Sequence, residues 1–243
     1  MKISVLTPSN RDFKALEIVS KGLMRQSFED FEWIIGSPKA PEGGLLMEYK
    51  HVGDPPKEQD DYWVLNKLYN SMIESAKGEL IVSIQDNTFF DPDALEKFWF
   101  HYENNPMAIV SGVGDKYLSD QFMNKTWEDP RRRDNGSFYE CYFADIEGNF
   151  CSVPKEALYS VGGFDEWLDK HAGMDWYSVF ARLHIKGEYS FYLDQSNESY
   201  SLEHPRYDDW EERNAIHGPY RERADMYKIE PVLDYLRENA TAE

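Results

Sequence analysis

Short apolar runs alternate with longer amphipathic segments along the first half of the chain. The apolar runs predict strands over residues 2–6, 31–35, 80–84 and 107–111. Apolar residues at helical spacing predict helices over residues 12–26, 62–76 and 91–103. Strands that alternate with helices of this length are typical of an α/β fold with a mostly parallel central sheet flanked by helices.

The chain is organised around residues 76–99. Lys77 and Gly78 end the preceding helix, with the glycine predicted as its C-cap. Residues 80–84 are apolar and β-branched, as expected of a strand buried on both faces of a parallel sheet. Asp91 and Pro92 predict the start of the next helix, with Asp91 as N-cap and the proline at the first helical position.

Three side chains that carry oxygen follow this central strand directly: Gln85, Asp86 and Asn87. They lie just past the carboxyl end of a strand, which is where open α/β sheets bind ligands. Hard oxygen donors in that place suit Mg²⁺ or Mn²⁺ together with a phosphate. The other interpretation is that Asp86 and Asn87 only cap a turn, and the residues by themselves leave both open.

The remaining elements are shorter and are separated by polar segments. Strands are predicted near residues 45–49 and over residues 149–153 and 189–193, and helices over residues 155–161 and 176–186. We find no internal repeat and no clear linker, so we expect one domain over residues 1–205. Residues 206–243 are charged and helical in pattern, and we expect a C-terminal helical extension packed on that domain.

Residues 115–148 contain the dense basic run of the chain, Arg131, Arg132 and Arg133. Such a run is usually a solvated loop. The functional alternative is a clamp on a diphosphate or an anionic acceptor, because arginine grips phosphate oxygens in pairs. Gly112 and Gly114 lack the third glycine of a dinucleotide-binding fingerprint, so they are weak support for NAD.

Composition narrows the choice of partners and compartment. The chain has 243 residues and a net charge of −19, whereas proteins that bind nucleic acid through its phosphates are usually basic. No apolar run is long enough to cross a membrane, and Met1 leads into the first strand without a signal peptide. Cys141 and Cys151 fit a reducing compartment and favour two thiols over a disulfide. We therefore expect a cytoplasmic protein without a broad nucleic-acid-binding surface.

Four blocks of residues follow one another along residues 1–205. They are Thr7-Pro8-Ser9-Asn10-Arg11 after the first strand, Asn70, Ile73, Ala76 and Gly78 before the central strand, Gln85-Asp86-Asn87 after it, and Gly162-Gly163-Phe164-Asp165-Glu166 followed by Gly173, Asp175, Arg182 and Gly187. In order and spacing these blocks resemble family 2 glycosyltransferases of the GT-A fold, although each block alone is weak.

That family binds a nucleotide-sugar at the carboxyl end of its sheet, and the resemblance assigns roles to single residues. It implies a donor site lined by Thr7, Pro8, Arg11, Asn70, Gln85 and Asp86. It implies that Asp175 is the catalytic base, and that Asp86, Asn87 and His204 hold a divalent cation, Mn²⁺ or Mg²⁺. Transfer of the sugar to an acceptor hydroxyl would then invert the anomeric configuration.

The sequence departs from the family pattern in three places. The metal motif, Asp-x-Asp in the family, is reduced to one carboxylate, that of Asp86. The acidic residues that often follow the second strand and recognise the base are replaced by Gly36, Ser37 and Pro38. The usual Glu-Asp pair near the catalytic position is reduced to Asp175.

Two other functions stay open. The first is a catalytically inactive GT-A scaffold that binds a nucleotide or a glycan. The loss of acidic residues from the family motifs favours this function, and the presence of both Asp86 and Asp175 opposes it. A sugar-1-phosphate nucleotidyltransferase would carry a glycine-rich loop with a lysine or arginine directly after the first strand. The segment from Thr7 to Arg11 is not such a loop.

Overall fold

The computed structural model of the protein describes residues 1–11, 13–134, 136–171 and 175–203. The predicted extension over residues 206–243 lies outside the described residues, and so does His204. Within the described part, no helix combines the length and the apolar character that crossing a membrane requires.

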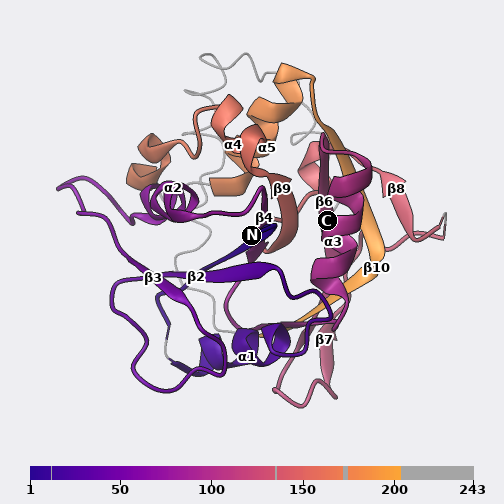
Figure 1. Ribbon diagram of the computed structural model, residues 1–243, viewed down its shortest axis with the longest axis horizontal. Helices are drawn as coiled ribbons and strands as arrows, with labels where there is room; N and C mark the ends of the chain where they lie inside the picture. The colour runs from indigo at the N-terminus through magenta and orange to yellow at the C-terminus, as the bar shows by residue number, and fades with distance from the viewer. Residues whose placement is uncertain (12, 135, 172–174, 204–243) are drawn as a thin grey trace.

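Ten strands of the described residues form one mixed sheet (Figure 1). Its parallel half runs in the order β3 (Lys50–Gly53), β2 (Phe31–Ser37), β1 (Ile3–Pro8) and β4 (Leu80–Ile84). Next to β4, β9 (Phe150–Pro154) is antiparallel to both β4 and β6 (Ala108–Tyr117), and β10 (Ser190–Leu202) runs parallel to β6. Three short strands pair antiparallel at the margins: β5 (Thr88–Phe90) and β8 (Phe138–Glu140) with β10, and β7 (Lys125–Trp127) with β6.

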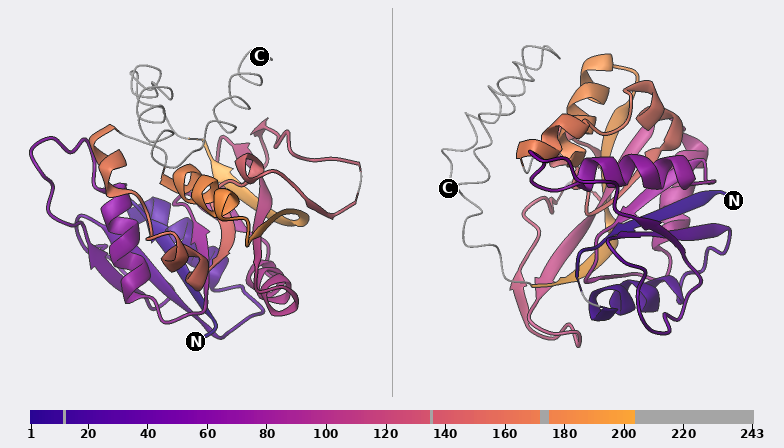
Figure 2. Two further views of the ribbon diagram at one scale, coloured as in Figure 1. Left: turned by 90° about the horizontal axis from the view of Figure 1, so that it is seen from above. Right: turned by 90° about the vertical axis from the view of Figure 1, so that its left-hand side faces the viewer.

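Helices cover both faces of this sheet, which makes a three-layer α/β/α arrangement. One face packs against α1 (Phe13–Leu23) and α3 (Ala94–Asn104), and the other against α2 (Leu65–Ser75), α4 (Lys155–Ser160) and α5 (Asp175–Lys186). In Figure 1, α2, α4 and α5 lie above the sheet and α1 lies below it, and the right-hand view in Figure 2 shows the same separation. Two 3₁₀ helices, η1 (Phe143–Asp145) and η2 (Glu166–His171), lie in the connections.

Strand periodicity explains how one sheet serves two cores. In β1, Val5 belongs to the cluster packed against α1 and α3, and the next residue, Leu6, belongs to the cluster packed against α2. Successive side chains of a strand point to opposite faces, so each central strand contributes to both clusters. All five residues of β4 are buried, as predicted for a strand covered on both faces.

The predicted fold class is confirmed, and several element boundaries are wrong. The strand expected near residues 45–49 lies at Lys50–Gly53, and β5 was not predicted. The strand expected over residues 189–193 continues to Leu202, because a shift of register between Asp194 and Glu198 lets β10 pair with β6 on both sides of the irregularity. Such a shift leaves no simple trace in the apolar pattern.

The predicted start of the third helix is also wrong. Its N-cap is Asp93 rather than Asp91, so Pro92 precedes the helix. Asp91 instead makes a tertiary contact, in which the hydroxyl of Tyr200 donates a hydrogen bond of 3.1 Å to Asp91 Oδ1. A partner 109 residues away thus overrides the local capping preference.

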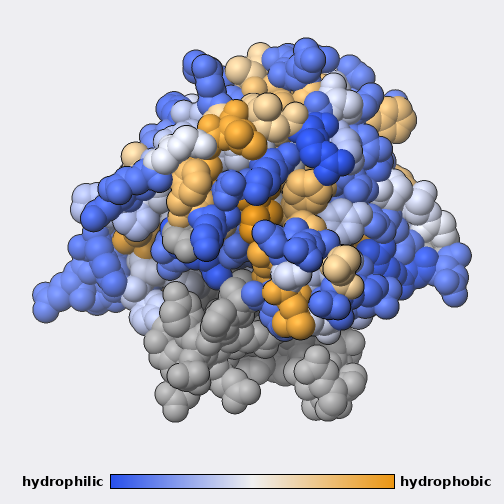
Figure 3. Space-filling model, turned by 90° about the horizontal axis from the view of Figure 1, so that it is seen from below, coloured by the Kyte–Doolittle hydropathy of each residue, from blue (hydrophilic) through white to orange (hydrophobic). Residues whose placement is uncertain are grey.

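The surface follows from the charged composition. The face in Figure 3 is mainly hydrophilic, with small and separate hydrophobic patches. Isolated apolar side chains on a surface are normal and need no partner. The patches of this face therefore do not by themselves indicate a binding surface.

The sequence predicted Gly78 as the C-cap of α2, and this is wrong. The C-cap is Ala76. Gly78 follows in the connection to β4, where its backbone N–H donates a hydrogen bond of 2.8 Å to Ser4 Oγ. A Cβ at this position would lie 2.5 Å from the backbone atoms Ile3 C and Ser4 N. Glycine is therefore required because the connection passes directly against β1.

We expect Gly78→Ala to lower the free energy of unfolding by about 1–3 kcal/mol, since overpacking against backbone forces a shift of β1 or of the connection. Urea denaturation at equilibrium measures the change.

Gly44→Ala is the matched control, because a Cβ at Gly44 meets nothing within 4 Å. It should stay within about 0.5 kcal/mol of the parent. Equal stability of the two variants would show that the approach of Gly78 to β1 does not constrain the sheet.

Candidate functional site

The candidate site begins where β1 and β4 end side by side. The two strands pair in parallel, with Leu6 opposite Ser83, so their carboxyl ends lie at the same edge of the sheet. The segment after β1 carries Ser9 and Arg11, and the segment after β4 carries Asp86. Parallel pairing therefore brings together residues that are 77 positions apart in the sequence.

Asp86 is held by both residues of the β1 segment. Ser9 Oγ donates a hydrogen bond of 2.6 Å to Asp86 Oδ2, and Arg11 Nε lies 3.4 Å from Asp86 Oδ1. Ser9 Oγ also accepts a hydrogen bond of 3.2 Å from the backbone N–H of Arg11, which closes the loop. The Asp86 side chain is 6% exposed and that of Arg11 is 31% exposed, so the carboxylate is covered and the guanidinium reaches solvent.

Asn87 has a strained backbone that ties the site to two other elements. Its φ is 59°, a left-handed conformation that asparagine tolerates better than most residues. Its N–H donates to Ala15 O at 3.1 Å, and its carbonyl accepts a hydrogen bond of 2.9 Å from the N–H of Leu202. The end of β10 therefore lies beside the Asp86 segment, and Leu202 precedes the predicted ligand His204 by two positions in the sequence.

The other predicted donor-site residues lie at or near the same edge but differ in availability. Thr7 is fully buried in β1, and its Oγ1 accepts a hydrogen bond of 3.0 Å from Trp33 Nε1. Pro8 is the last residue of β1 and is half-buried. Gln85 is exposed, and its N–H donates to Asn149 O at 2.9 Å. Of these three side chains, that of Gln85 is the most accessible to a ligand.

Asn70 is bound to the turn that contains Gly162 and Gly163. Asn70 Oδ1 accepts a hydrogen bond of 2.7 Å from Phe164 N, and Nδ2 donates to Phe164 O at 3.0 Å and to Glu166 Oε1 at 2.9 Å. Gly163 has φ 73°, and a Cβ there would lie 2.5 Å from Asn70 Oδ1. The amide of Asn70 is thus occupied by the turn.

Sequence reasoning missed Asp169, which caps α2 from a distance. Its Oδ1 accepts hydrogen bonds from the backbone N–H of Asn66 at 2.9 Å and from Asn66 Nδ2 at 2.8 Å, and its Oδ2 accepts one from the N–H of Lys67 at 3.1 Å. Burial, the largest effect, raises the pKa of Asp169, although these hydrogen bonds oppose the shift. No local signal reveals this cap, because the carboxylate lies in η2, more than 100 residues after α2 begins.

Asn70 and Asp169 together fix α2 against the segment that precedes α5. The predicted base, Asp175, is the first residue of α5, and its side chain lies outside the described part of the structure. Arg182, in α5, donates hydrogen bonds to Val161 O and Gly163 O at 2.5 and 2.7 Å. The turn is therefore held from both α2 and α5, which limits where α5 can begin.

Arg131 and Arg132 of the arginine run bind other residues of the protein. Arg131 is 12% exposed and donates to Asp129, Ser111 Oγ, Gly112 O and Asp145 O. Burial by itself would lower the pKa of Arg131, but the hydrogen bond and charge of Asp129 outweigh it and raise the pKa. Arg132 pairs with Glu198 at 2.8 Å and with Asp115 at 3.3 Å. The guanidinium of Arg131 is thus a structural cation and has little capacity left for a diphosphate.

A further acidic group lies before α2 and was not singled out from the sequence. Oxygen atoms of Glu58, Asp60 and Asp61 lie within 4.8 Å of one another. Lysines already neutralise them: Lys67 lies 2.7 Å from Asp61 Oδ2 and 3.2 Å from Glu58 Oε1, and Lys170 lies 2.7 Å from Asp60 Oδ2. Proximity of carboxylates alone does not make this group a cation site.

The cysteines behave as predicted, since no disulfide joins Cys141 to Cys151. Burial raises the pKa of the Cys141 thiol to about 12. The thiol is therefore protonated at neutral pH, and a protonated thiol is a poor nucleophile. Cysteine chemistry is thus not expected from Cys141.

The donors around Asp86 fit Mg²⁺ or Mn²⁺ in kind. The Asp86 carboxylate and the side-chain carbonyls of Gln85 and Asn87 are hard oxygen donors. A cation that accompanies a diphosphate needs only one or two protein carboxylates, because phosphate and water supply its other ligands.

Comparison with solved structures identifies the fold. S. aureus TarS 1–349 in complex with UDP has a TM-score of 0.60 at 13% identity, covering 84% of this chain and 61% of that one. The same TarS segment in complex with UDP-GlcNAc has a TM-score of 0.61 at 11% identity, with 85% and 60% covered. GalNAc-T7 with UDP, GalNAc and Mn²⁺ has a TM-score of 0.61 at 10% identity, with 86% and 45% covered.

These neighbours are glycosyltransferases of the GT-A type, and the chain has the GT-A fold. The chain spans less than two thirds of the length of each of them. No protein-family model and no curated protein matches it, so membership of family 2 stays a prediction.

The hydrogen bonds of Asn70 lead to a prediction about stability. Asn70→Ala should lower the free energy of unfolding by about 1–3 kcal/mol, because it leaves buried polar groups of the turn without partners. Urea denaturation measures the loss, and the amide of Phe164 should exchange its hydrogen faster.

Asn124→Ala serves as control, since Asn124 is an exposed loop residue. It should change neither quantity. An unchanged exchange rate of Phe164 in Asn70→Ala would contradict the structural role assigned to Asn70.

Proposed function

We propose that the protein is a glycosyltransferase that moves a sugar from a nucleotide-diphosphate sugar to an acceptor hydroxyl, with inversion at the anomeric carbon. The observation that carries this proposal is the covered Asp86 carboxylate at the carboxyl end of β4, held by Ser9 and Arg11. It lies where α/β sheets bind ligands, in a chain that has the GT-A fold. The motif resemblance along residues 1–205 supports the same function.

The proposed reaction requires positive charge beside the leaving group. The bond from the anomeric carbon to the diphosphate breaks, and the diphosphate departs with the bonding electron pair. Arg11 would face this charge, since its guanidinium is partly exposed at the edge of the site. A Mn²⁺ or Mg²⁺ held by Asp86, Asn87 and His204 would supply further positive charge when bound.

The acceptor requires a base on the other side of the donor. Asp175 would accept the proton of the acceptor hydroxyl while the hydroxyl oxygen forms the new bond to the anomeric carbon. Attack opposite to the departing diphosphate inverts the configuration. Support for this assignment comes from the position of Asp175 at the start of α5, directly after the segment that Asn70 and Asp169 fix to α2.

A catalytically inactive scaffold that binds a nucleotide or a glycan is the second candidate. One observation favours it: Ser9 and Arg11 already engage both oxygens of Asp86, the carboxylate of the reduced metal motif. Such a protein would bind a nucleotide without turning over any donor. Binding and turnover measured on the same preparation separate the two candidates.

We expect Asp86→Ala to weaken Mn²⁺-dependent binding of UDP by about tenfold or more, which equals 1.4 kcal/mol or more. Loss of the carboxylate removes the main anionic ligand for the cation. Isothermal titration calorimetry with UDP, in Mn²⁺ and in EDTA, measures the effect.

Asp120→Ala is the control, since Asp120 is an exposed loop residue. It should bind UDP like the parent. Equal affinities of the parent in Mn²⁺ and in EDTA, matched by Asp86→Ala, would remove the metal from this proposal.

Asp175→Asn should lower turnover by roughly 10²–10⁴-fold, because the amide keeps the shape of the side chain but cannot accept the proton. Donor affinity should stay unchanged. The readout is UDP release from UDP-sugars with a panel of hydroxyl acceptors, compared with UDP affinity in the same preparation.

Turnover close to that of the parent would exclude Asp175 as the base. Loss of UDP binding or of folding would instead assign the residue a structural role. A parent protein that binds UDP but turns over no donor would favour the inactive scaffold.

A further inference from the structure

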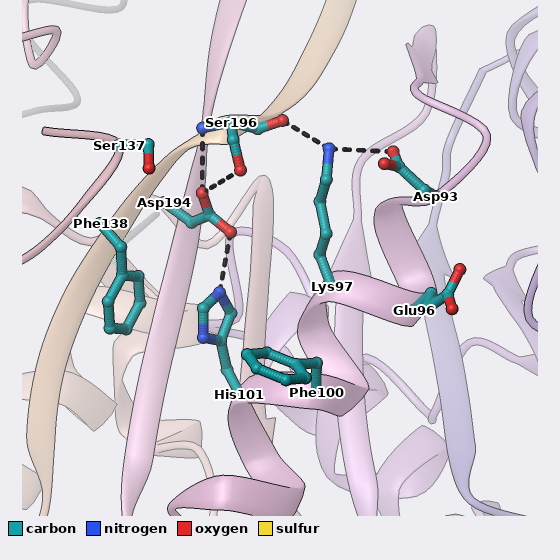
Figure 4. A pocket seen from close by; sticks show the side chains of 9 residues that line it. All are labelled: Asp93, Glu96, Lys97, Phe100, His101, Ser137, Phe138, Asp194 and Ser196. Carbon is teal, nitrogen blue, oxygen red and sulfur yellow. Dashed lines mark hydrogen bonds and ion pairs between the residues drawn. The ribbon is translucent and has the colours of Figure 1, made fainter.

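A pocket lies on the α3 side of the molecule, between α3, the start of β8 and the irregular part of β10 (Figure 4). Its volume is about 310 Å³, at the lower end of the range for small-molecule sites. Its walls come from different elements than the Asp86 site, which is made by the segments after β1 and β4. The pocket is therefore a separate candidate site.

A histidine oriented by a buried carboxylate lies in this pocket. His101 Nε2 lies 2.8 Å from Asp194 Oδ2, and Asp194 Oδ1 accepts hydrogen bonds from Ser196 N at 2.9 Å and Ser196 Oγ at 2.6 Å. Burial by itself would raise the pKa of Asp194, but the hydrogen bonds from His101 and Ser196 outweigh it and lower the pKa. The ionised carboxylate can only accept, so Nε2 carries the proton of the ring.

The second ring nitrogen of His101 is left for a ligand. In Figure 4, only one of the two nitrogens is joined to a partner, and no described residue bonds to Nδ1. In the neutral form of the ring with the proton on Nε2, Nδ1 is a hydrogen-bond acceptor. The ring cannot easily turn away, because it stacks on Phe138 with centroids 4.2 Å apart and planes at 8°.

Aromatic surface lies beside this acceptor. Phe138 is enclosed on two sides, by His101 and by Tyr192, whose ring centroid is 4.9 Å away. Phe100 touches His101 only edge to face, with centroids 5.7 Å apart, and is 60% exposed. Phe100 therefore offers an apolar surface next to a directed hydrogen-bond acceptor and the hydroxyl of Ser137.

The charges of the pocket disfavour an anionic ligand. Lys97 is already bound, since its Nζ lies 2.9 Å from Asp93 Oδ1 and donates to Ser196 O at 2.6 Å. With Asp93, Glu96 and Asp194 nearby, the pocket would repel an anion. A metal ion is disfavoured as well: among the described residues, the acidic cluster before α2 is the one group of three or more potential metal ligands close enough to share an ion. A neutral molecule with both hydroxyl groups and apolar faces matches the histidine nitrogen and the exposed Phe100 ring of this pocket.

We propose that this pocket binds a neutral saccharide, with a hydroxyl donating to His101 Nδ1 and an apolar face of the sugar ring against Phe100. Sugars combine these two surfaces in one ring. The site is distinct from the donor site proposed at Asp86, and the proposal holds whether or not the protein transfers sugars.

The test follows the imidazole of His101 by NMR while the protein is titrated with sugars in the absence of nucleotide. The probes are maltotriose, cellotriose, mannotriose and N-acetylchitotriose, and the spectrum of His101→Gln assigns the resonance. At least one trisaccharide should shift the His101 signal saturably. Phe100→Ala should weaken that binding by about tenfold, equal to 1.4 kcal/mol. Because Phe100 is exposed, its truncation should leave folding intact, whereas truncation of His101 would remove the hydrogen bond to buried Asp194.

Tyr159→Ala is the matched control, because Tyr159 is an exposed aromatic residue of α4 outside the pocket, and it should bind like the parent. Inorganic phosphate and Mn²⁺ are titrated in parallel and should leave the His101 signal unchanged. The proposal is overturned if no trisaccharide shifts that signal, if phosphate or Mn²⁺ shifts it at lower concentration than any sugar, or if Tyr159→Ala weakens binding as much as Phe100→Ala.

Discussion

Parallel pairing of β1 with β4 is the constraint on which the rest of the structure depends. Both strands are buried on two faces, and their register places the segments after Pro8 and Ile84 at the same edge. The closeness of the strands extends to their other ends, where the connection at Gly78 passes against β1 without room for a side chain. A slip of one residue would exchange the two cores and separate Ser9 from Asp86.

Features of the fold and the site that depend on residues close together in the sequence could be predicted from the sequence. The buried strand Leu80–Ile84 and the oxygen-bearing residues after it were visible in the sequence, because burial on two faces and an abrupt change to polar residues are local patterns. The same holds for the alternation of strands and helices, and thus for the α/β class. The family resemblance placed Arg11 and Asp86 in one donor site, whereas the hydrogen bond from Ser9 to Asp86 was not predicted.

The parts that the sequence did not predict depend on distant partners. Asp91 has the sequence pattern of a helix N-cap, but in the structure it accepts a hydrogen bond from Tyr200. Gly78 has the pattern of a C-cap, but in the structure it lies against β1. The hydrogen bond between the Asn70 amide and the turn at Phe164, 94 residues later, was not predicted, and the place of Asn70 in the donor site stays a prediction. Arg131 was weighed as a phosphate clamp or a solvated loop, and it is mostly buried beside Asp129. For Asp91, Gly78 and Asn70 the contact is with a residue far away in the sequence, which local patterns do not reveal.

The cap of α2 by Asp169 has a consequence for the order in which the chain can fold. The first turn of α2 obtains its hydrogen-bond acceptors from a residue 103 positions after Asn66. During synthesis at the usual 5–20 residues per second, this turn stays without its cap for about 5–20 s after Asn66 is added. Until then α2 can pack on the emerging strands only through its apolar face. Completion of η2 is therefore the step that caps α2, and the contact closes a loop of 103 residues.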